Sequence, residues 1–276
     1  MVESKKKKWI MTAIMLVITI FAVFPFVWMI LLSFKDNNEI ILNPLVLPGA
    51  IDFSNYKDAL DTLNYPQLYG NTFLICLISM AIELVITFLS SFVIARMTFH
   101  QRAKNAMYAY LLLGLSISPF ILLFPVYRIT VLFHIGGKLR LVFPYVATAI
   151  SFNTLLFTGY LRKIPREMDE AAVIDGCNLR QLIMKIIVPM SKPVIATIVI
   201  FNVLYIWNEF PFASVMLRDI RDYTLSMGAS FFKGKFSVNY GGIIASSIMI
   251  IIPELIFYGL FQKNIVDGMT AGAVKG

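Results

Sequence analysis

The sequence predicts an all-α membrane protein with six transmembrane helices and both termini in the cytoplasm. Three observations support this class: an apolar composition, six long apolar segments, and an uneven distribution of basic residues between them. Of the 276 residues, 58% are apolar and 14% are charged, whereas soluble proteins average about 45–50% and about 25%. A soluble interior of this size cannot enclose so many large apolar side chains, and a disordered chain would contain few of them.

Each apolar segment is long enough to cross a bilayer, which takes about 20 residues of helix. The six segments are residues 9–34, 66–95, 106–127, 141–161, 193–217 and 236–262. The first follows four lysines, as a signal peptide would, but a signal peptide has an apolar run of only about 7–15 residues. We therefore expect this segment to be an uncleaved helix.

The distribution of lysine and arginine predicts the orientation. With the N-terminus in the cytoplasm, the cytoplasmic segments contain 15 of the 24 Lys and Arg residues, and the longer outer segments contain 9. Cytoplasmic loops of membrane proteins carry such an excess. The net charge of +8 is therefore better explained by a membrane surface than by nucleic acid.

Several kinds of chemistry are not expected. Cys76 and Cys177 are far apart in sequence, and His100 and His134 are the only histidines, so neither a disulfide framework nor a zinc site is predicted. No glycine-rich phosphate-binding loop is present in the sequence. We therefore predict that this chain is not an enzyme, holds no cofactor and hydrolyses no nucleotide.

The stretch 165–189, between the fourth and fifth segments, is predicted to form two short helices joined by a tight turn. Pro165 can begin the first helix, and carboxylates in its first turns complement the helix dipole. Gly176 can adopt the left-handed conformation that ends a helix. Asn178 and Gln181 have the spacing of a capping box at the start of the second helix, which Pro189 is expected to end.

Two surfaces of this stretch have distinct patterns. The second helix carries an apolar stripe at helical spacing, formed by Leu179, Leu182, Ile183 and Ile186. On the first helix, small side chains beside a charge would let a partner protein approach closely. From the residues alone, docking to a partner and an ordinary loop on the membrane surface are both open.

The spacing in this stretch resembles the EAA loop in the membrane subunits of binding-protein-dependent ABC importers. The family pattern is Glu-Ala-Ala, three residues, Gly, nine residues, Ile, one residue, Leu and Pro. The matching residues here are Glu170-Ala171-Ala172, Gly176, Ile186, Val188 and Pro189. The one departure is valine in place of leucine, a change between similar apolar residues.

Other short motifs resemble the maltose and multiple-sugar type within that family, and specifically its six-span partner. They are Asn71-Thr72, Ala95-Arg96, Pro125-Val126-Tyr127, Trp207-Asn208-Glu209-Phe210, Thr224-Leu225 and the tail 262–276. The resemblance covers nearly the whole chain. It implies the type I ABC importer permease fold and the transport of a carbohydrate.

The resemblance also implies roles for individual residues. The ATPase-coupling contact would be made by Glu170, Ala171, Ala172, Asp175 and Gly176. An outer loop facing a solute-binding protein would include Arg221, Asp222, Phe231 and Phe232. The residues themselves indicate roles for Asn208 and Glu209, because polar groups within a span are costly unless they have a partner and Pro211 can kink the helix. They would line the substrate path or the permease interface, or form an interhelical hydrogen bond within this chain.

The implied assembly contains a second, homologous permease subunit, which makes a heterodimer, and two cytoplasmic ATPase subunits that bind ATP and Mg²⁺. It also contains an extracellular or periplasmic solute-binding protein and lies in the bacterial cytoplasmic membrane. In this chain, residues 1–66 would form the N-terminal tail, first helix and outer loop. Residues 67–263 would form the transport core, and residues 264–276 a cytoplasmic tail that either reaches the ATPase or frays.

Three alternatives remain open at the level of the sequence. One is an ABC importer subunit for a non-sugar solute, such as an amino acid or phosphate. The second is an ion-coupled secondary transporter that works alone. The third is a membrane-embedded enzyme, which would need polar catalytic groups clustered at one depth.

Overall fold

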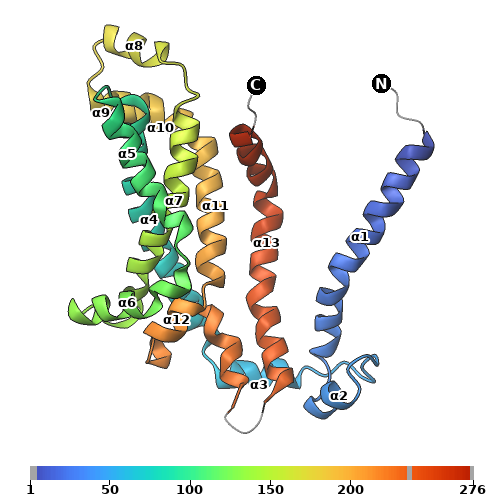
Figure 1. Ribbon diagram of the computed structural model, residues 1–276. Helices are drawn as coiled ribbons and strands as arrows, with labels where there is room; N and C mark the ends of the chain where they lie inside the picture. Colours follow the sequence, from blue (N-terminus) through green and yellow to red (C-terminus); the bar gives the residue numbers. More distant parts are fainter. Residues whose placement is uncertain (1–4, 235–237, 274–276) are drawn as a thin grey trace. The chain divides into compact units, whose positions relative to one another are not determined.

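The computed structural model describes residues 5–234 and 238–273, except for the side chains of residue 6 and of residues 263–273, and it is almost entirely helical (Figure 1). The longer helices are α1 (Lys5–Leu32), α4 (Tyr65–Arg96), α5 (Gln101–Leu112), α6 (Pro119–Leu132), α7 (Val142–Leu161), α11 (Lys192–Asn208) and α13 (Tyr240–Ala273). The shorter elements are α2 (Asn37–Leu42), α3 (Ser54–Thr62), η1 (Leu113–Ser116), η2 (Gly137–Leu141), α8 (Glu167–Ile174), α9 (Leu179–Gln181), η3 (Leu182–Ile187), α10 (Val188–Met190), α12 (Pro211–Met216), η4 (Ile220–Asp222) and η5 (Leu225–Phe232). Within the described ranges, β-pairing is limited to one isolated bridge, between Lys233 and Val238. The predicted all-α class is confirmed.

The chain forms two compact units. The first contains Met1–Tyr65 and Gly228–Pro253, and the second contains Pro66–Met227 and Glu254–Gly276. The expected division into residues 1–66, 67–263 and 264–276 separates parts of the chain by their role in transport. It stays a prediction.

In the first unit, buried polar side chains fix the path of the chain after α1. Asn55 donates hydrogen bonds from Nδ2 to the carbonyl oxygens of Ser33 and Lys35, at 2.8 and 2.7 Å. The Lys35 ammonium donates to the carbonyl oxygens of Asn43 and Val46, at 2.7 and 2.8 Å. These contacts satisfy carbonyl groups where no helix does so. The side chains of α1 itself are exposed along its most apolar stretch, as expected for a helix that contacts lipid or a partner.

In the second unit, α4, α7 and α11 run side by side, with α8 beyond one end and α6 and α12 at the other (Figure 1). We call these the α8 end and the α12 end. One apolar cluster lies toward the α8 end and includes Phe88, Phe92, Phe157, Leu161 and Ile198. A second cluster lies toward the α12 end and includes Ile75, Tyr145, Ile206, Phe212 and Met216.

The predicted spans are confirmed in part. Four described helices are long and apolar enough to cross a membrane: Lys7–Leu32, Tyr65–Arg96, Gly137–Leu161 and Tyr240–Gln262. Two bent pairs, each counted as one span, would bring the number to six. The last helix extends to Ala273, and residues 274–276 of the expected tail lie outside the described residues.

The expectation of a continuous third span over 106–127 is wrong. The helices on either side of residues 117–118 differ in direction by 102°. Ser118 has an extended backbone, with φ −67° and ψ 130°, because Pro119 disfavours a helical conformation in the residue before it. The span is therefore broken at this proline.

The fifth span, expected over 193–217, is also broken. Helix α11 ends at Asn208, Glu209 has an extended backbone with ψ 111°, and α12 begins at Pro211. Proline provides no backbone N–H for a continuing helix. At its other end, α11 is bent by 70° from the preceding helical segment Leu179–Met190.

The loop between α7 and α11, residues 162–191, is called the α8–α10 loop below. Its predicted turn is confirmed, because Gly176 has a φ of +79°. The capping box is also confirmed: Gln181 N donates to Asn178 Oδ1, and Asn178 N donates to Gln181 Oε1, both at 2.9 Å. The second helix does not end at Pro189, since α10 includes this residue and ends at Met190. A π-helical stretch, η3, precedes the proline, which itself cannot donate a backbone hydrogen bond.

We predict that Gly176→Ala destabilises the turn between α8 and α9 by about 1 kcal/mol, because an L side chain is disfavoured at positive φ. Hydrogen exchange of the α8 amides should then become about fivefold faster, the factor that corresponds to this energy. Gly159→Ala in α7 is the control, because a Cβ added there meets no atom within 4 Å. Equal exchange rates in wild type and Gly176→Ala would contradict the need for glycine at this turn.

Candidate functional site

Helix α8 presents a mixed charged and apolar surface at its end of the second unit. Glu170, Ala171, Asp175 and Gly176, four of the five predicted coupling residues, are exposed. The side chains of Val173 and Ile174 are 64% and 85% exposed. Exposed apolar groups rimmed by charge are typical of a surface that binds a protein partner.

Ala172 does not lie on this surface. It is buried in the apolar cluster at the α8 end, which also contains Leu182 and Ile187 of the α8–α10 loop. The expectation that Ala172 lies open to a partner is therefore wrong, because this face of α8 packs against its own chain. The exposed Val173 and Ile174 were missed at the level of the sequence, where an apolar pair in a short helix looks the same whether it is buried or exposed.

The second helix of the loop lies on the bundle through the predicted apolar stripe. Leu182 is buried, and Ile183 and Ile186 are partly buried against the same cluster. Leu179 is exposed, so the stripe is confirmed for three of its four residues. Helix α8 and this helix therefore share one apolar core with α4, α7 and α11.

A buried arginine ties the loop to the end of α4. Arg96 donates from Nη1 to the carbonyl oxygen of Ile164, at 2.6 Å, and from Nη2 to that of Pro165, at 3.2 Å. Its Nη2 also forms a 2.7 Å ion pair with Asp169 Oδ1 of α8, and its side chain is 3% exposed. Charge-assisted hydrogen bonds in a buried setting are among the stronger polar contacts in a protein. Arg96 entered the sequence analysis only as part of a resemblance, and its anchoring role was not predicted.

At the α12 end, Glu209 caps α12 and connects it to α7. Its carboxylate is buried and accepts hydrogen bonds from the Tyr145 hydroxyl, at 2.7 Å, and from the backbone N–H of Phe212 and Ala213, at 2.7 and 3.2 Å. These donors complete the hydrogen bonding expected of a buried carboxylate. Of the roles left open for Glu209, the structure favours an interhelical hydrogen bond within this chain.

The neighbouring Asn208 is exposed. Its Nδ2 donates to Glu254 Oε1 at 2.7 Å and to the carbonyl oxygen of Leu204 at 2.9 Å. Glu254, one of the carboxylates within the predicted spans, thus has a polar partner. Because Asn208 is exposed, a contact with substrate or with a second permease stays a prediction for this residue.

A cavity of about 290 Å³ lies between the bundle helices. Its lining includes Pro119 of α6, and aromatic and hydrogen-bonding side chains of α7 and α11: Thr148, Phe152, Phe201, Asn202 and Tyr205. Phe152 and Phe201 meet edge to face, with ring centroids 5.5 Å apart. None of these residues was singled out from the sequence, because their convergence depends on how three helices pack.

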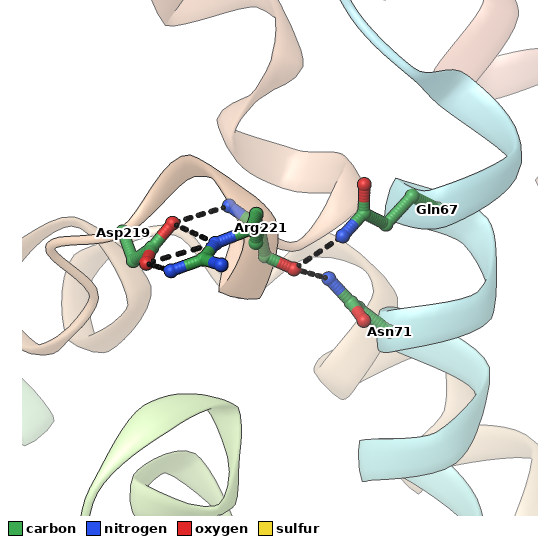
Figure 2. A network of polar contacts seen from close by, with 4 residues as sticks. All are labelled: Gln67, Asn71, Asp219 and Arg221. Carbon is green, nitrogen blue, oxygen red and sulfur yellow. Dashed lines mark hydrogen bonds and ion pairs between the residues drawn. The ribbon is translucent and has the colours of Figure 1, made fainter.

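Polar side chains of α4 fix the segment after α12, residues 219–225, as Figure 2 shows. Gln67 Nε2 and Asn71 Nδ2 donate to the carbonyl oxygen of Arg221, at 2.9 and 2.8 Å. Asn71 Nδ2 also donates to the carbonyl oxygen of Tyr223, at 2.9 Å. The amide side chains therefore bind the main chain of the segment.

Two further contacts complete this attachment. The Lys138 ammonium donates to Asn71 Oδ1 at 2.6 Å, and the N–H of Leu225 donates to Thr72 Oγ1 at 2.9 Å. The motif Asn71-Thr72 carried only a family resemblance in the sequence. In the structure, both residues act on the 219–225 segment, which is about 150 positions away along the chain.

The Arg221 side chain is held in an exposed position by Asp219 (Figure 2). Its Nε and Nη2 donate to the two carboxylate oxygens at 2.6–3.1 Å, and the side chains are 78% and 41% exposed. The hydrogen bonds from Arg221 lower the pKa of Asp219 to about 2, and those to Asp219 raise the pKa of Arg221. The pair is therefore ionised throughout the physiological pH range, with a guanidinium open to a partner.

The other predicted loop residues differ in position. Asp222 is partly exposed in the second unit, and Phe231 is partly exposed in the first. Phe232 is buried, and its ring packs so closely on Gly242 of α13 that a Cβ there would lie 2.4 Å from the ring. The expectation that Phe232 lies on a recognition surface is therefore wrong, because Gly242 lets the ring pack directly on the helix backbone.

The candidate sites hold no metal-binding cluster. Among the residues whose placement is described, no group of three or more His, Cys, Asp or Glu side chains could bind a metal ion.

Comparison with known proteins identifies the family. Residues 87–270 match the family described as the inner membrane component of binding-protein-dependent transport systems. The chain belongs to this family. The resemblance drawn from the EAA pattern is thereby confirmed.

Individual relatives match nearly the whole length of this permease. It is 32% identical over 271 residues to the trehalose/maltose transport system permease protein MalG of Thermococcus litoralis, covering 95% of this chain and 94% of MalG. It is 28% identical over 271 residues to AmyC of Thermoanaerobacterium thermosulfurigenes, a probable starch degradation products transport system permease protein, covering 98% and 97%. A chain of a bacterial ABC transporter involved in the import of the acidic polysaccharide alginate has the same fold, with a TM-score of 0.78, 22% identity and coverage of 95% of this chain and 99% of that one.

We predict that Glu209→Ala lowers the free energy of unfolding of the permease by about 3 kcal/mol, since three buried donors would lose their acceptor. A thermal shift of the purified complex in detergent measures the loss as a Tm several degrees lower. Asn208→Ala is the control, and should change Tm by a degree or less because this side chain is exposed. An unchanged Tm together with lost transport in Glu209→Ala would instead assign Glu209 to the substrate path.

Proposed function

We propose that this chain is the permease subunit of an ATP-driven carbohydrate importer and couples to a separate ATPase subunit through α8. The observation that carries the proposal is the construction of the α8–α10 loop. A short helix presents Glu170 and an apolar tip outward, while Arg96 and an apolar core attach the helix to the bundle. Such a rigid projection can transmit force from another protein.

The coupling step follows from this geometry. When ATP binding closes the ATPase subunits, α8 moves with them, and Arg96 and the shared core carry the displacement to α4, α7 and α11. To change a permease from 99% inward-facing to 99% outward-facing, the partner must bind the outward state about 5.5 kcal/mol more tightly. Glu170, Val173 and Ile174 supply charged and apolar contacts for that difference.

The carbohydrate assignment is supported by the relatives. The names of MalG and AmyC refer to trehalose, maltose and starch degradation products. The aromatic and amide lining of the 290 Å³ cavity suits sugars, which present apolar ring faces and hydroxyl groups together. We therefore place a section of the sugar path beside Phe152, Phe201 and Asn202.

The proposed assembly also contains a homologous second permease, two ATPase subunits that hold ATP and Mg²⁺, and a solute-binding protein. The α8 end then lies in the cytoplasm, and the α12 end faces the binding protein in a bacterial plasma membrane. The exposed, preorganised guanidinium of Arg221 is a contact point for an acidic group of the binding protein.

Reconstitution tests the function as a whole. Proteoliposomes containing this chain, its second permease and its ATPase should accumulate a labelled oligosaccharide when ATP and the binding protein are supplied. Proteoliposomes containing this chain alone should accumulate none. Accumulation by the single chain under an ion gradient would instead support a secondary transporter, and ATP-driven uptake of only a non-sugar solute would contradict the carbohydrate assignment.

We predict that Glu170→Lys lowers the rate of ATP-driven uptake at least tenfold, because a reversed charge would oppose docking of α8 to the ATPase subunit. The transport rate and the ATPase rate are measured in the same proteoliposomes. Glu167→Lys is the matched control, since it reverses an exposed charge one turn earlier in the helix, and it should retain most of the uptake. Normal uptake by Glu170→Lys would remove this residue from the coupling contact.

We predict that Arg221→Ala increases, by about tenfold, the concentration of binding protein that half-maximally stimulates ATP hydrolysis. The substitution removes a preorganised, charged hydrogen-bond donor from the proposed contact with the binding protein. Arg218→Ala removes a nearby exposed guanidinium and serves as the control. An equal change in both variants would indicate a general effect of charge and not a specific contact.

The pH dependence of this effect can also be predicted. The pKa of Asp219 is depressed to about 2, so its pairing with Arg221 is fully present above the ordinary pKa of about 3.9 and is lost only as the pH falls through about 2. The half-maximal concentration of binding protein is measured for wild type and for Arg221→Ala. The ratio of the two concentrations should therefore be constant from pH 8 to pH 5. A ratio that declines within this range would show that Asp219 does not control the guanidinium.

A further inference from the structure

A basic cavity of about 320 Å³ lies at the α8 end of the second unit. It is formed where α4 ends, α5 begins and α7 passes into the α8–α10 loop. The polar residues that line it are Arg96, Gln101, Lys104, Asn105, Arg162 and Arg166. Four of these six side chains are cationic, and none is acidic.

The positive charge in this cavity is only partly balanced by the chain itself. Asp169 pairs with Arg96, and among the described residues no carboxylate pairs with Lys104, Arg162 or Arg166. Two of these cations lie over aromatic rings instead: Lys104 Nζ is 5.2 Å from the ring centre of Phe99, and Arg162 Cζ is 5.0 Å from that of Tyr108. Such contacts position a cation without neutralising it.

Two of the cations are buried. Lys104 is 7% exposed, and the Arg96 side chain is 3% exposed, with no hydrogen-bond partner for its Nε. A buried ammonium or guanidinium is costly unless an anion compensates it. Two buried cations that line one cavity together with the exposed Arg162 and Arg166 are therefore better explained by an anionic ligand than by a general positive surface.

The start of α5 adds donors to the same cavity. This helix of 12 residues has no side-chain cap at its N-terminus, so its first N–H groups are not used by a capping side chain. Gln101, Lys104 and Asn105, from its first two turns, line the cavity. A helix N-terminus together with guanidinium groups is a combination that favours phosphate.

We propose that this cavity binds a phosphate group, carried by an anionic phospholipid or present as free phosphate. The proposed orientation places the cavity at the cytoplasmic surface of the membrane, where anionic lipids are found. The exposed side chains of Met97 and Phe99 next to the cavity provide apolar surface for acyl chains. These two features favour the phospholipid.

Occupancy of the cavity has a consequence for the α8–α10 loop. Arg96 contacts the loop at Ile164, Pro165 and Asp169, and Arg166 directly precedes α8. A phosphate group bound by these side chains would set the position of α8, so that coupling to the ATPase depends on the lipid. This consequence rests on the proposed function, whereas the binding itself does not.

The experiment measures binding to the purified importer complex in detergent, by native mass spectrometry with dioleoyl phosphatidylglycerol and with dioleoyl phosphatidylcholine. A parallel calorimetric titration uses inorganic phosphate. The test variant is the double substitution Lys104→Gln and Arg162→Gln. The matched control is Lys163→Gln with Arg180→Gln, which removes two exposed charges of the same region that do not line the cavity.

We expect the wild-type complex to retain phosphatidylglycerol over phosphatidylcholine. The test variant should bind it at least tenfold more weakly, and the control variant within twofold of wild type. Binding of inorganic phosphate with the same variant dependence, and no lipid preference, would identify free phosphate as the source. The proposal is overturned if wild type prefers neither ligand, or if the test and control variants bind alike.

The wild-type titrations keep the test decisive if the double variant does not assemble. Loss of the ATPase subunits from the test variant, with no phosphate or lipid preference in wild type, would assign the cavity to a protein contact and overturn the proposal. None of these measurements depends on sugar transport. Failure of the phosphate site and failure of the transport assignment are therefore distinguishable.

Discussion

The attachment of a short helix to the transmembrane bundle is the physical constraint on which the proposed activity depends. A single buried guanidinium, that of Arg96, reaches from the end of α4 to two loop carbonyl groups and to Asp169 of α8. Ala172 of α8 and the loop residues Leu182 and Ile187 belong to the same core as the helices of the bundle. Because α8 has both a polar and an apolar attachment, the proposed coupling requires that a contact made at its tip be passed to α4, α7 and α11.

The parts of the fold that depend on neighbouring residues could be predicted from the sequence. The turn at Gly176 and the capping box of Asn178 and Gln181 require only local backbone geometry and hydrogen bonding, and both are present. The uninterrupted apolar segments gave α4 and α7 to within one residue at each end, whereas α13 begins four residues later and ends eleven residues later than predicted. The third and fifth segments were predicted as single helices because hydropathy shows how apolar a segment is, but not where its helix axis changes direction. Pro119 and Pro211 interrupt the helices in these two segments.

The parts that depend on distant residues could not be predicted in the same way. Glu209, Tyr145 and α12 form one hydrogen-bonded group, although Tyr145 and Glu209 are separated by 64 positions. Ala172 and Phe232 were expected at recognition surfaces and are buried, since the side of a helix or turn that faces the core is decided by what packs against it. The exposed tip formed by Val173 and Ile174, and the basic cavity at the start of α5, have no signal in the sequence beyond ordinary residue types.

The way in which Asn71 and Gln67 bind the 219–225 segment has an evolutionary consequence. Their amide groups donate to main-chain carbonyl oxygens, which every amino acid at those positions would supply. The path of the segment is therefore fixed in part through its main chain, and these contacts do not need the exposed side chains of Ile220 and Arg221. A transporter built in this way can acquire a new docking partner by substitution of exposed residues in this segment alone, without a change in helix α4, which holds the segment.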